Sequence, residues 1–418
     1  MPVYVPVAVS EPVRRPPPPF LYFILFLPFG ATTAFVSLTV VNIWSQDKTI
    51  GEAALGAMVA MNILPHTFKV LWAPIVDTVW NGRSWYIVGN LVSSAAILAT
   101  GFVPVSKGNM GLLTGLVLLN GFATTFVGMT TEALMAHVCP PEQRGSAAGW
   151  SQAGNVGGGI VGALALSLFD WTGIVSLPAI VVSVVLAMCS VVLLALPPIH
   201  PIDRPTFLES AKELGRDIKG IFWSRLGVIA AALSLLPIGS GAAANLFGAK
   251  NFVAEWHVPQ KLVGPLNGAV GGVAAMLGSL VGGVLSNKIE KKRAYAVSGI
   301  ALALAAFAMA LGPRTTTSYV IWVFGYQFAI GMCYAAFTAF VLDIIGKGAA
   351  ATKYNLLASL ANIPITLMGR WDGQVAEAHG HGSMLWFDGA MGIAGAVVLL
   401  IIAALALPKR ARAQSASS

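Results

Sequence analysis

The sequence is poor in charge. Only 10% of its 418 residues are charged, whereas soluble globular domains carry roughly 25%. Hydrophobic residues make up 56% of the chain, and its mean hydropathy is +0.76. So few charged side chains cannot cover a water-facing surface. The composition therefore excludes a soluble globular protein and indicates that lipid surrounds most of the chain.

The sequence also lacks the residue patterns of several kinds of site. Its three cysteines, Cys139, Cys189 and Cys333, are far apart and have no metal-ligand spacing, so they indicate neither a disulfide framework nor a zinc site. No nucleophile–base pair, His/Asp metal cluster or glycine-rich phosphate loop occurs. His379 and His381 in the last outer loop are more typical of a solvated loop than of a metal site. We expect no enzyme activity, no cofactor and no metal.

Proline is concentrated at the start of the chain. Residues 1–19 include Pro2, Pro6, Pro12 and the run Pro16 to Pro19. Because proline lacks a backbone donor, this segment is predicted to be an extended, disordered cytoplasmic tail. The apolar run that starts at Phe20 is long enough to span a bilayer. It is therefore expected to be a retained first helix rather than a signal peptide.

Apolar runs long enough to cross a bilayer recur along the rest of the chain, since spanning takes about 20 apolar residues. The sequence predicts an all-α membrane protein with twelve transmembrane helices. We expect them near 20–44, 52–77, 85–105, 109–136, 145–169, 172–196, 226–249, 260–286, 294–312, 317–345, 352–376 and 382–407.

The basic residues indicate which way the chain is inserted. If the N-terminus is inside, 18 of the 25 Lys and Arg fall on inner tails and loops and 5 on outer loops, while Lys69 and Arg370 lie within helices. An excess of positive charge marks the cytoplasmic side. The net charge of +8 is thus a topology signal rather than a nucleic-acid footprint, and both termini are expected in the cytoplasm.

Charged segments recur at half the length of the chain. Asp77 to Arg83 follows the second predicted helix, and Asn287 to Arg293 follows the eighth, 210 positions later. Such an offset predicts two six-helix halves of parallel topology, at 20–196 and 226–407. Between them, 197–225 is predicted to be a cytoplasmic amphipathic linker. A basic cytoplasmic tail at 408–418 completes the chain.

Over its whole length the chain resembles major facilitator superfamily permeases, which share this arrangement. Within the superfamily it is similar to the AmpG-like branch, which includes muropeptide permeases and acetyl-CoA transporter relatives. The segment Phe68-Lys-Val-Leu-Trp-Ala-Pro-Ile-Val-Asp77 carries the resemblance, supported by Pro140-Pro-Glu-Gln-Arg-Gly145 and Tyr354-Asn-Leu-Leu-Ala-Ser-Leu-Ala361. Some siderophore-uptake permeases share the same pattern. The sequence departs from the general superfamily loop after the second helix, because Asp77 is followed by Thr78 rather than a basic residue.

Lys69 is the sharpest candidate for function, because an intramembrane lysine costs roughly 2.5–3.5 kcal/mol to insert. Asn62, His66 and Lys69 recur at helical spacing and form one polar face. One interpretation is a cavity lining that attracts an anionic group. The other is a lysine that snorkels or pairs with a carboxylate in a gate between the halves.

The eleventh predicted helix carries a longer polar stripe, which consists of Asn355, Ser359, Asn362, Thr366 and Arg370. In the fold that the sequence resembles, helices 2 and 11 adjoin across the cavity. Arg370 would then face the path from the outer side, where its planar guanidinium suits a carboxylate or phosphate. Alternatively, Arg370 is an outer-end arginine paired with Asp372 or Glu377.

Other spans add polar side chains that have no use in lipid but suit a shared aqueous cavity. The candidates are Gln152 and Asn155 on the fifth helix and Gln327 and Tyr334 on the tenth. Glycines on the fifth helix also resemble an antiporter pattern, although small-residue packing explains them equally well.

Three acid–base pairs at helix ends match the gate network of the superfamily. They are Asp77 with Arg83, Glu132 with Arg144, and Asp343 with Lys353. Glu132 or Asp372 could instead carry a proton, because burial disfavours an ionised carboxyl group.

Together these features predict a secondary active transporter of the bacterial inner membrane that works by alternating access. The leading hypothesis is proton-coupled uptake of an anionic small solute such as a muropeptide or siderophore, with H⁺ and the bilayer as the other partners. A drug or metabolite exporter is the alternative, and a membrane-embedded sensor without transport is a weaker one.

Overall fold

The computed structural model describes residues 16–196, 225–345 and 350–406, together with Lys212, Gly215, Arg216 and Lys219. All regular elements in these ranges are helical. Most of the proline-rich N-terminal tail, nearly all of the predicted linker at 197–225, Lys347 and the basic C-terminal tail lie outside the described residues.

The first group of helices runs from residue 21 to 195. It comprises α1 (Leu21–Ala34), which continues through a π turn (Phe35–Val40) into α2 (Val41–Trp44), then α3 (Glu52–Phe68), α4 (Ala73–Thr78), α5 (Gly82–Thr100), α6 (Met110–Val138), α7 (Arg144–Thr172) and α8 (Ser176–Cys189), which ends in a 3-10 segment (Ser190–Ala195). We call this set the N-terminal group. Within it, α1 packs along α7, and α5 packs between α6 and α8.

The second group runs from residue 225 to 406. It comprises α10 (Arg225–Ser234), a 3-10 segment (Ala242–Leu246), α11 (Lys250–Glu255), α12 (Gln260–Pro265), which continues through a π turn (Leu266–Val270) into α13 (Gly271–Lys288), then α14 (Lys291–Leu311), α15 (Thr316–Ile345) and α16 (Ala350–Ala406). We call this set the C-terminal group. Non-helical backbone at Gly380, with φ of 82°, reverses the direction of α16, so that it consists of two antiparallel arms.

By length and composition, nine helices in the described ranges could cross a membrane. Large apolar side chains remain exposed on their outer faces, among them Val184, Met188 and Leu194 on α8 and its extension. Lipid can cover such a surface, whereas water cannot do so cheaply. A multi-pass helical membrane protein is thus confirmed, while the number twelve stays an expectation.

Two predicted helices are interrupted, each where proline stands nearby. The helix expected at 52–77 breaks into a 3-10 turn at Lys69–Leu71 before α4 restarts with Pro74 in its first turn. The helix expected at 226–249 breaks between Ser234 and Ala242, in a segment that contains Pro237, Gly239 and Gly241. Both predictions of a continuous helix are therefore wrong. Proline has no backbone N–H group to continue the helical hydrogen bonds, which accounts for the breaks.

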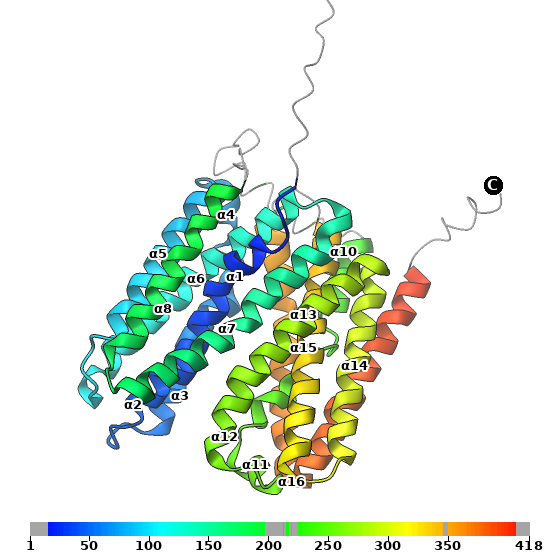
Figure 1. Ribbon diagram of the computed structural model, residues 1–418. Helices are drawn as coiled ribbons and strands as arrows, with labels where there is room; N and C mark the ends of the chain where they lie inside the picture. The colour runs from blue at the N-terminus through cyan, green and yellow to red at the C-terminus, as the bar shows by residue number, and fades with distance from the viewer. Residues whose placement is uncertain are drawn as a thin grey trace, which may run out of the picture.

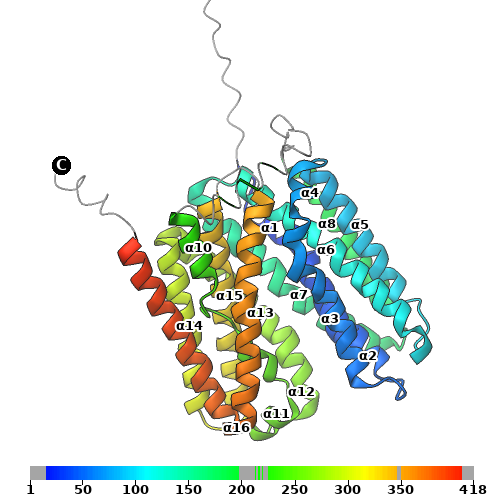
Figure 2. The same ribbon diagram turned by 180° about the vertical axis from the view of Figure 1, so that it is seen from behind.

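The two groups stand side by side and meet along α7 and α13 (Figure 1). Glycines bring these backbones into contact. A Cβ atom at Gly283 would lie 2.6 Å from the carbonyl oxygen of Gly145 and 2.7 Å from the Cα of Gly149. Nearby, the Asn287 amide donates to the Ser146 hydroxyl over 2.6 Å. Helix α16 of the C-terminal group also packs against α4 of the N-terminal group. The two groups diverge toward the end that carries α2 and α11 (Figure 2).

Candidate functional site

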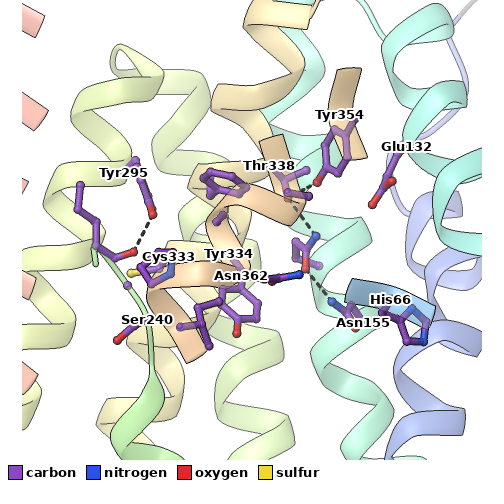
Figure 3. A pocket seen from close by; sticks show the side chains of 18 of the residues that line it. His66, Glu132, Asn155, Ser240, Tyr295, Cys333, Tyr334, Thr338, Tyr354 and Asn362 are labelled. Atoms are coloured by element: carbon purple, nitrogen blue, oxygen red, sulfur yellow. Dashed lines mark hydrogen bonds between the residues drawn. The ribbon is translucent and has the colours of Figure 1, made fainter. Parts of the chain in front are cut away.

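A cavity of about 180 Å³ lies between the two groups. The N-terminal group contributes the charged and amide-bearing residues Lys69, Glu132, Gln152 and Asn155, together with His66 and two phenylalanines. The C-terminal group contributes mostly apolar and aromatic residues, among them Ile238, Tyr295 and Phe337. One wall is therefore polar and charged, and the opposite wall is largely apolar (Figure 3).

Lys69 and Glu132 form an ion pair in this lining, with 3.5 Å between Nζ and Oε1. Their side chains are only 7% and 3% exposed. The 3-10 turn that begins at Lys69 replaces the end of α3 and positions the lysine beside α6, which carries Glu132. The ammonium group also lies 5.8 Å from the ring centroid of Phe29. The second carboxylate oxygen of Glu132 is buried without a hydrogen-bond partner.

His66 lies in the same lining, one turn before Lys69. Its Nε2 is 3.4 Å from the Thr124 hydroxyl, and its ring meets that of Phe29 edge to face at 4.6 Å. Asn62 lies outside the lining. It is buried and accepts a hydrogen bond from the Asn120 amide over 2.9 Å. Of the three residues on the predicted polar face of α3, the structure thus brings His66 and Lys69 to the cavity and leaves Asn62 in helix packing.

A chain of hydrogen bonds joins the two groups across the cavity. The Asn155 amide donates to the Gln152 carbonyl oxygen over 3.0 Å, and the Gln152 amide donates to the Thr338 hydroxyl over 3.0 Å. The hydroxyl groups of Thr338 and Tyr354 are also 3.0 Å apart. Asn362 and Tyr334 line the same cavity (Figure 3). Side chains from α7, α15 and α16 therefore converge, as predicted for Gln152, Asn155, Tyr334 and Asn362.

The remaining predicted lining residues lie elsewhere. Gln327 packs beside Gly271 on α13. Thr366 and Arg370 follow Asn362 along α16 toward Gly380, and both are exposed. Arg370 forms no ion pair with Asp372 or Glu377 among the described residues, so the alternative of an outer-end pair with either residue is wrong.

Four of the predicted gate residues lie near helix ends, Asp77 at the end of α4, Arg144 at the start of α7, Asp343 at the end of α15 and Lys353 at the start of α16. The partners of Arg144 and Glu132 differ from those expected. Arg144 pairs with Asp343 of the C-terminal group over 3.3 Å, and Lys291 joins the same carboxylate at 3.5 Å. Neither pair includes Lys353, which is half-buried on α16. The predicted pair Glu132–Arg144 is therefore wrong, because Glu132 pairs with Lys69 and Arg144 pairs with Asp343. The predicted pair Asp343–Lys353 stays a prediction.

Asp77, the last residue of the motif that carries the AmpG-like resemblance, caps the start of α16. Its carboxylate accepts hydrogen bonds from the backbone amides of Ala351 and Thr352 and from the Thr352 hydroxyl, at 3.2, 2.9 and 2.7 Å. Arg83, its predicted partner, instead donates to the carbonyl oxygens of Leu193 and Leu196. At this end the Asp77 cap and the Arg144–Asp343 pair link the two groups, whereas Arg83 binds within the N-terminal group.

Comparison with known proteins agrees with this architecture. The family model described as Major Facilitator Superfamily matches residues 20–368. The chain belongs to the major facilitator superfamily. It is 26% identical over 388 residues to the anhydromuropeptide permease of Escherichia coli K12, which covers 90% of this chain and 77% of that protein. It is 24% identical over 388 residues to the putative transporter AmpG 4 of Rickettsia conorii, covering 85% and 91%.

These relatives support the place of this major facilitator in the AmpG-like branch. Among solved structures, the human organic anion transporter MFSD10 (TETRAN) superposes with a TM-score of 0.69 at 13% identity, over 93% of this chain and 100% of that one. The likeness shows the fold. Membership of the superfamily identifies a membrane transporter of small solutes rather than an enzyme.

Sequence reasoning missed several residues of this major facilitator's site. Ser240 and Tyr295 line the cavity from the C-terminal group, and Tyr354 connects to Gln152 through Thr338, which does belong to the polar face expected on the tenth helix. Asp388 was also overlooked, although an aspartate inside a predicted span is a functional candidate by default. Asp372, predicted as a gate or coupling residue, is fully buried away from the cavity lining, and neither of its carboxylate oxygens has a hydrogen-bond partner.

Proposed function

We propose that this major facilitator imports an anionic sugar–peptide solute of the muropeptide type, coupled to protons, across a bacterial inner membrane with both termini in the cytoplasm. The observation that supports this most is the ion pair of Lys69 and Glu132 in the cavity wall. Buried charges are retained where they have a use, because they cost more than apolar residues of the same size.

The geometry of the pair suits an exchange of partners. Charge-assisted N–H···O hydrogen bonds have typical lengths of about 2.7–2.9 Å, whereas Lys69 and Glu132 are 3.5 Å apart. When Glu132 takes up a proton, Lys69 loses its counter-charge. A carboxylate of the solute can then replace Glu132 beside the ammonium group. Proton uptake and anion binding would thus favour each other at one place.

The opposite wall favours a solute with apolar surface as well as charge. Ligand sites combine apolar and aromatic walls with a few polar groups that fix orientation, and Tyr295, Tyr334 and Phe337 provide such a wall here. A sugar–peptide has carboxylates for Lys69, amides for Gln152 and Asn155, and carbon-bound faces for the rings. The named function of the Escherichia coli relative, an anhydromuropeptide permease, supports the same class. A siderophore with carboxylate groups is the next candidate.

The glycines of α7, which also resemble an antiporter pattern, have a packing role. An added Cβ would lie 2.2 Å from backbone atoms of α1 at both Gly154 and Gly158, and 2.7 Å from α1 at Gly162. Close approach of two helices requires these glycines whatever the direction of transport. They therefore give efflux no separate support, and uptake is the function that we propose.

Transport into proteoliposomes tests the proposal. Purified protein is reconstituted, a pH gradient is imposed, and entry of a radiolabelled anhydromuropeptide is followed with and without the gradient. We expect gradient-dependent accumulation that Lys69→Ala abolishes. Lys250→Ala, which removes an exposed lysine at the start of α11, is the matched control. No flux of the anhydromuropeptide, or accumulation only in the outward direction, would overturn the proposal.

A further inference from the structure

Two buried carboxylates, Asp372 and Asp388, lie inside the C-terminal group, away from the ion pair of Lys69. Asp372 is 0% exposed and Asp388 is 5% exposed. They lie on the two arms of α16, each eight residues from the reversal at Gly380. At a rise of about 1.5 Å per residue, both are about 12 Å from that turn. Because the arms are antiparallel, the two aspartates reach the same depth.

The partners of the two aspartates differ. The Tyr326 hydroxyl of α15 donates to Asp388 Oδ2 over 2.7 Å, and the Ser240 hydroxyl donates to Asp388 Oδ1 over 3.5 Å. Both oxygens of Asp372 are buried without any hydrogen-bond partner. By its place on the antiparallel arm of α16, Asp372 lies at the depth of Asp388 and its partner Tyr326.

No cation neutralises this pair within the described ranges. The guanidinium of Arg314 approaches Gly382, but it stacks on Trp256 and donates to the carbonyl oxygens of Met309 and Ala310. His381, close to Gly380, is paired with Glu255 over 2.6 Å. The other titratable neighbour is the buried thiol of Cys333 on α15, beside Tyr326.

Ionising both Asp372 and Asp388 at this buried position would cost free energy. A buried charge without a partner costs several kcal/mol, and two carboxylates in one site retain a proton between them. Asp388 has two hydroxyl donors and is the better anion. Asp372 has no donor and is the better place for the proton.

We propose that Asp372 and Asp388 form a proton-binding site of the C-terminal group, which exchanges its proton with the central cavity through Ser240 during transport. The site deepens the proposed proton-coupled uptake and rests on it, since it adds a proton-binding place in the C-terminal group to the one that Glu132 provides in the N-terminal group. It is distinct from Glu132, which lies in the other group beside Lys69.

Ser240 provides the connection because it belongs to both places. It lines the cavity (Figure 3) and donates to Asp388. It stands between Gly239 and Gly241, whose φ angles are 67° and 63°. An added Cβ would lie 2.5 Å from Cys333 Cβ at Gly239 and 2.8 Å from Ile330 Cδ1 at Gly241. Glycine is required at both positions, because any other residue would strain the positive φ angle and collide with α15. The two glycines therefore allow the broken helix to hold Ser240 between the cavity and Asp388.

Two modes of transport in proteoliposomes separate coupling from solute binding. Counterflow, which exchanges labelled for unlabelled solute, needs no net proton movement, whereas accumulation against a gradient does. With one coupled proton, a gradient of about one pH unit sustains roughly tenfold accumulation. We expect Asp372→Asn and Asp388→Asn to lose that accumulation and to retain counterflow. Asp170→Asn, at an exposed carboxylate near the end of α7, is the control and should keep both.

A second measurement requires no solute. Infrared difference spectra of the purified protein across a pH titration report the carbonyl stretch of a buried protonated carboxyl group. We expect a band in the unmodified protein and in Asp170→Asn that is absent from Asp372→Asn, besides any band of Glu132, which Asp372→Asn retains. Asparagine has nearly the same size as aspartate, and a monodisperse elution profile shows whether each variant has folded.

The outcomes distinguish the two proposals. Accumulation that survives in both aspartate variants, or an infrared spectrum of Asp372→Asn that keeps every band of the unmodified protein, would overturn the proton site. Accumulation driven equally by a sodium gradient at constant pH would overturn it as well, since the same oxygen atoms would then hold a metal cation. If the unmodified protein moves no anhydromuropeptide but the band depends on Asp372, the solute is wrong and the proton site stands.

Discussion

Lys69 and Glu132 come from positions 63 residues apart and meet as a buried ion pair, 3.5 Å between Nζ and Oε1, in the wall of the central cavity. The pair depends on a break in the second membrane-spanning segment, where α3 gives way to a 3-10 turn at Lys69. The ammonium group of Lys69, which would be costly in lipid, therefore lies in the wall of the cavity and has Glu132 as its partner. The same place combines a cation for an anionic solute with an acid that can take a proton.

Removing one charge of this pair is predicted to harm the fold more than removing both. Lys69→Met leaves the Glu132 carboxylate buried without its cation, which costs about 3–5 kcal/mol. The double variant Lys69→Met with Glu132→Gln removes both charges and is expected to recover most of that loss, while uptake stays absent. Thermal unfolding in detergent, followed by the elution of folded protein, measures the difference. A single variant as stable as the double would show that the pair is not coupled.

Joining the groups at one end is predicted to stop transport. The side chains of Ser146 on α7 and Asn287 on α13 are in hydrogen-bond contact, so a disulfide between cysteines at these positions would join the two groups. We expect Ser146→Cys with Asn287→Cys, in a background where the three native cysteines are replaced, to lose uptake on oxidation and to regain it on reduction. Each single cysteine variant is the control. Full transport by the oxidised protein would exclude separation of the groups at this end.

The cap at the start of α16 is predicted to stabilise the state in which this end is closed. Asp77→Asn keeps one carbonyl acceptor but loses the charge near a helix N-terminus, worth about 1 kcal/mol, or roughly a fivefold shift in population. A cysteine in place of Ala358, which lines the cavity, reports the shift through its reaction with an impermeant maleimide applied from this end. Faster labelling is expected. An unchanged rate would mean that the cap contributes nothing to closure.

Thr338 is predicted to stabilise the protein through Gln152. Thr338→Val removes the acceptor of the Gln152 amide and leaves a buried donor unpaired, at a cost of about 1–3 kcal/mol in unfolding free energy. Thr338→Ser keeps the hydroxyl and should unfold close to the unmodified protein. Equal losses in the valine and serine variants would assign the effect to the methyl group and not to the hydrogen bond.

Much of the architecture was visible in the sequence because lipid imposes strict rules. Long apolar runs, basic loops and the half-length offset lead to a helical membrane protein of the major facilitator type. The cavity wall was also partly visible, since polar side chains such as Gln152, Asn155 and Asn362 stand out on apolar helices. These signals depend on composition and spacing along one helix, which the sequence contains.

The ion pairs were harder to predict because they depend on how each helix is rotated and which helix stands beside it. The sequence predicts that Glu132 pairs with Arg144 because their positions at helix ends match the gate network of the superfamily. In the structure Glu132 pairs with Lys69, and Arg144 reaches Asp343 in the other group. The interruption near Ser240 had a local signal that was overlooked. Pro237, Gly239 and Gly241 together are typical of a break rather than of a continuous helix.

The glycine contact between α7 and α13 has a mechanical consequence. Where backbones touch without intervening side chains, there are no interlocked rotamers to release when one helix tilts against the other. The contact at Gly145, Gly149 and Gly283 is therefore flat, and the two groups can tilt about it as rigid bodies with little repacking of side chains. Resistance to that tilting comes instead from the polar contacts beside the glycines, such as Asn287 with Ser146 and Arg144 with Asp343. Changes at these contacts would therefore alter the rate of the transport cycle.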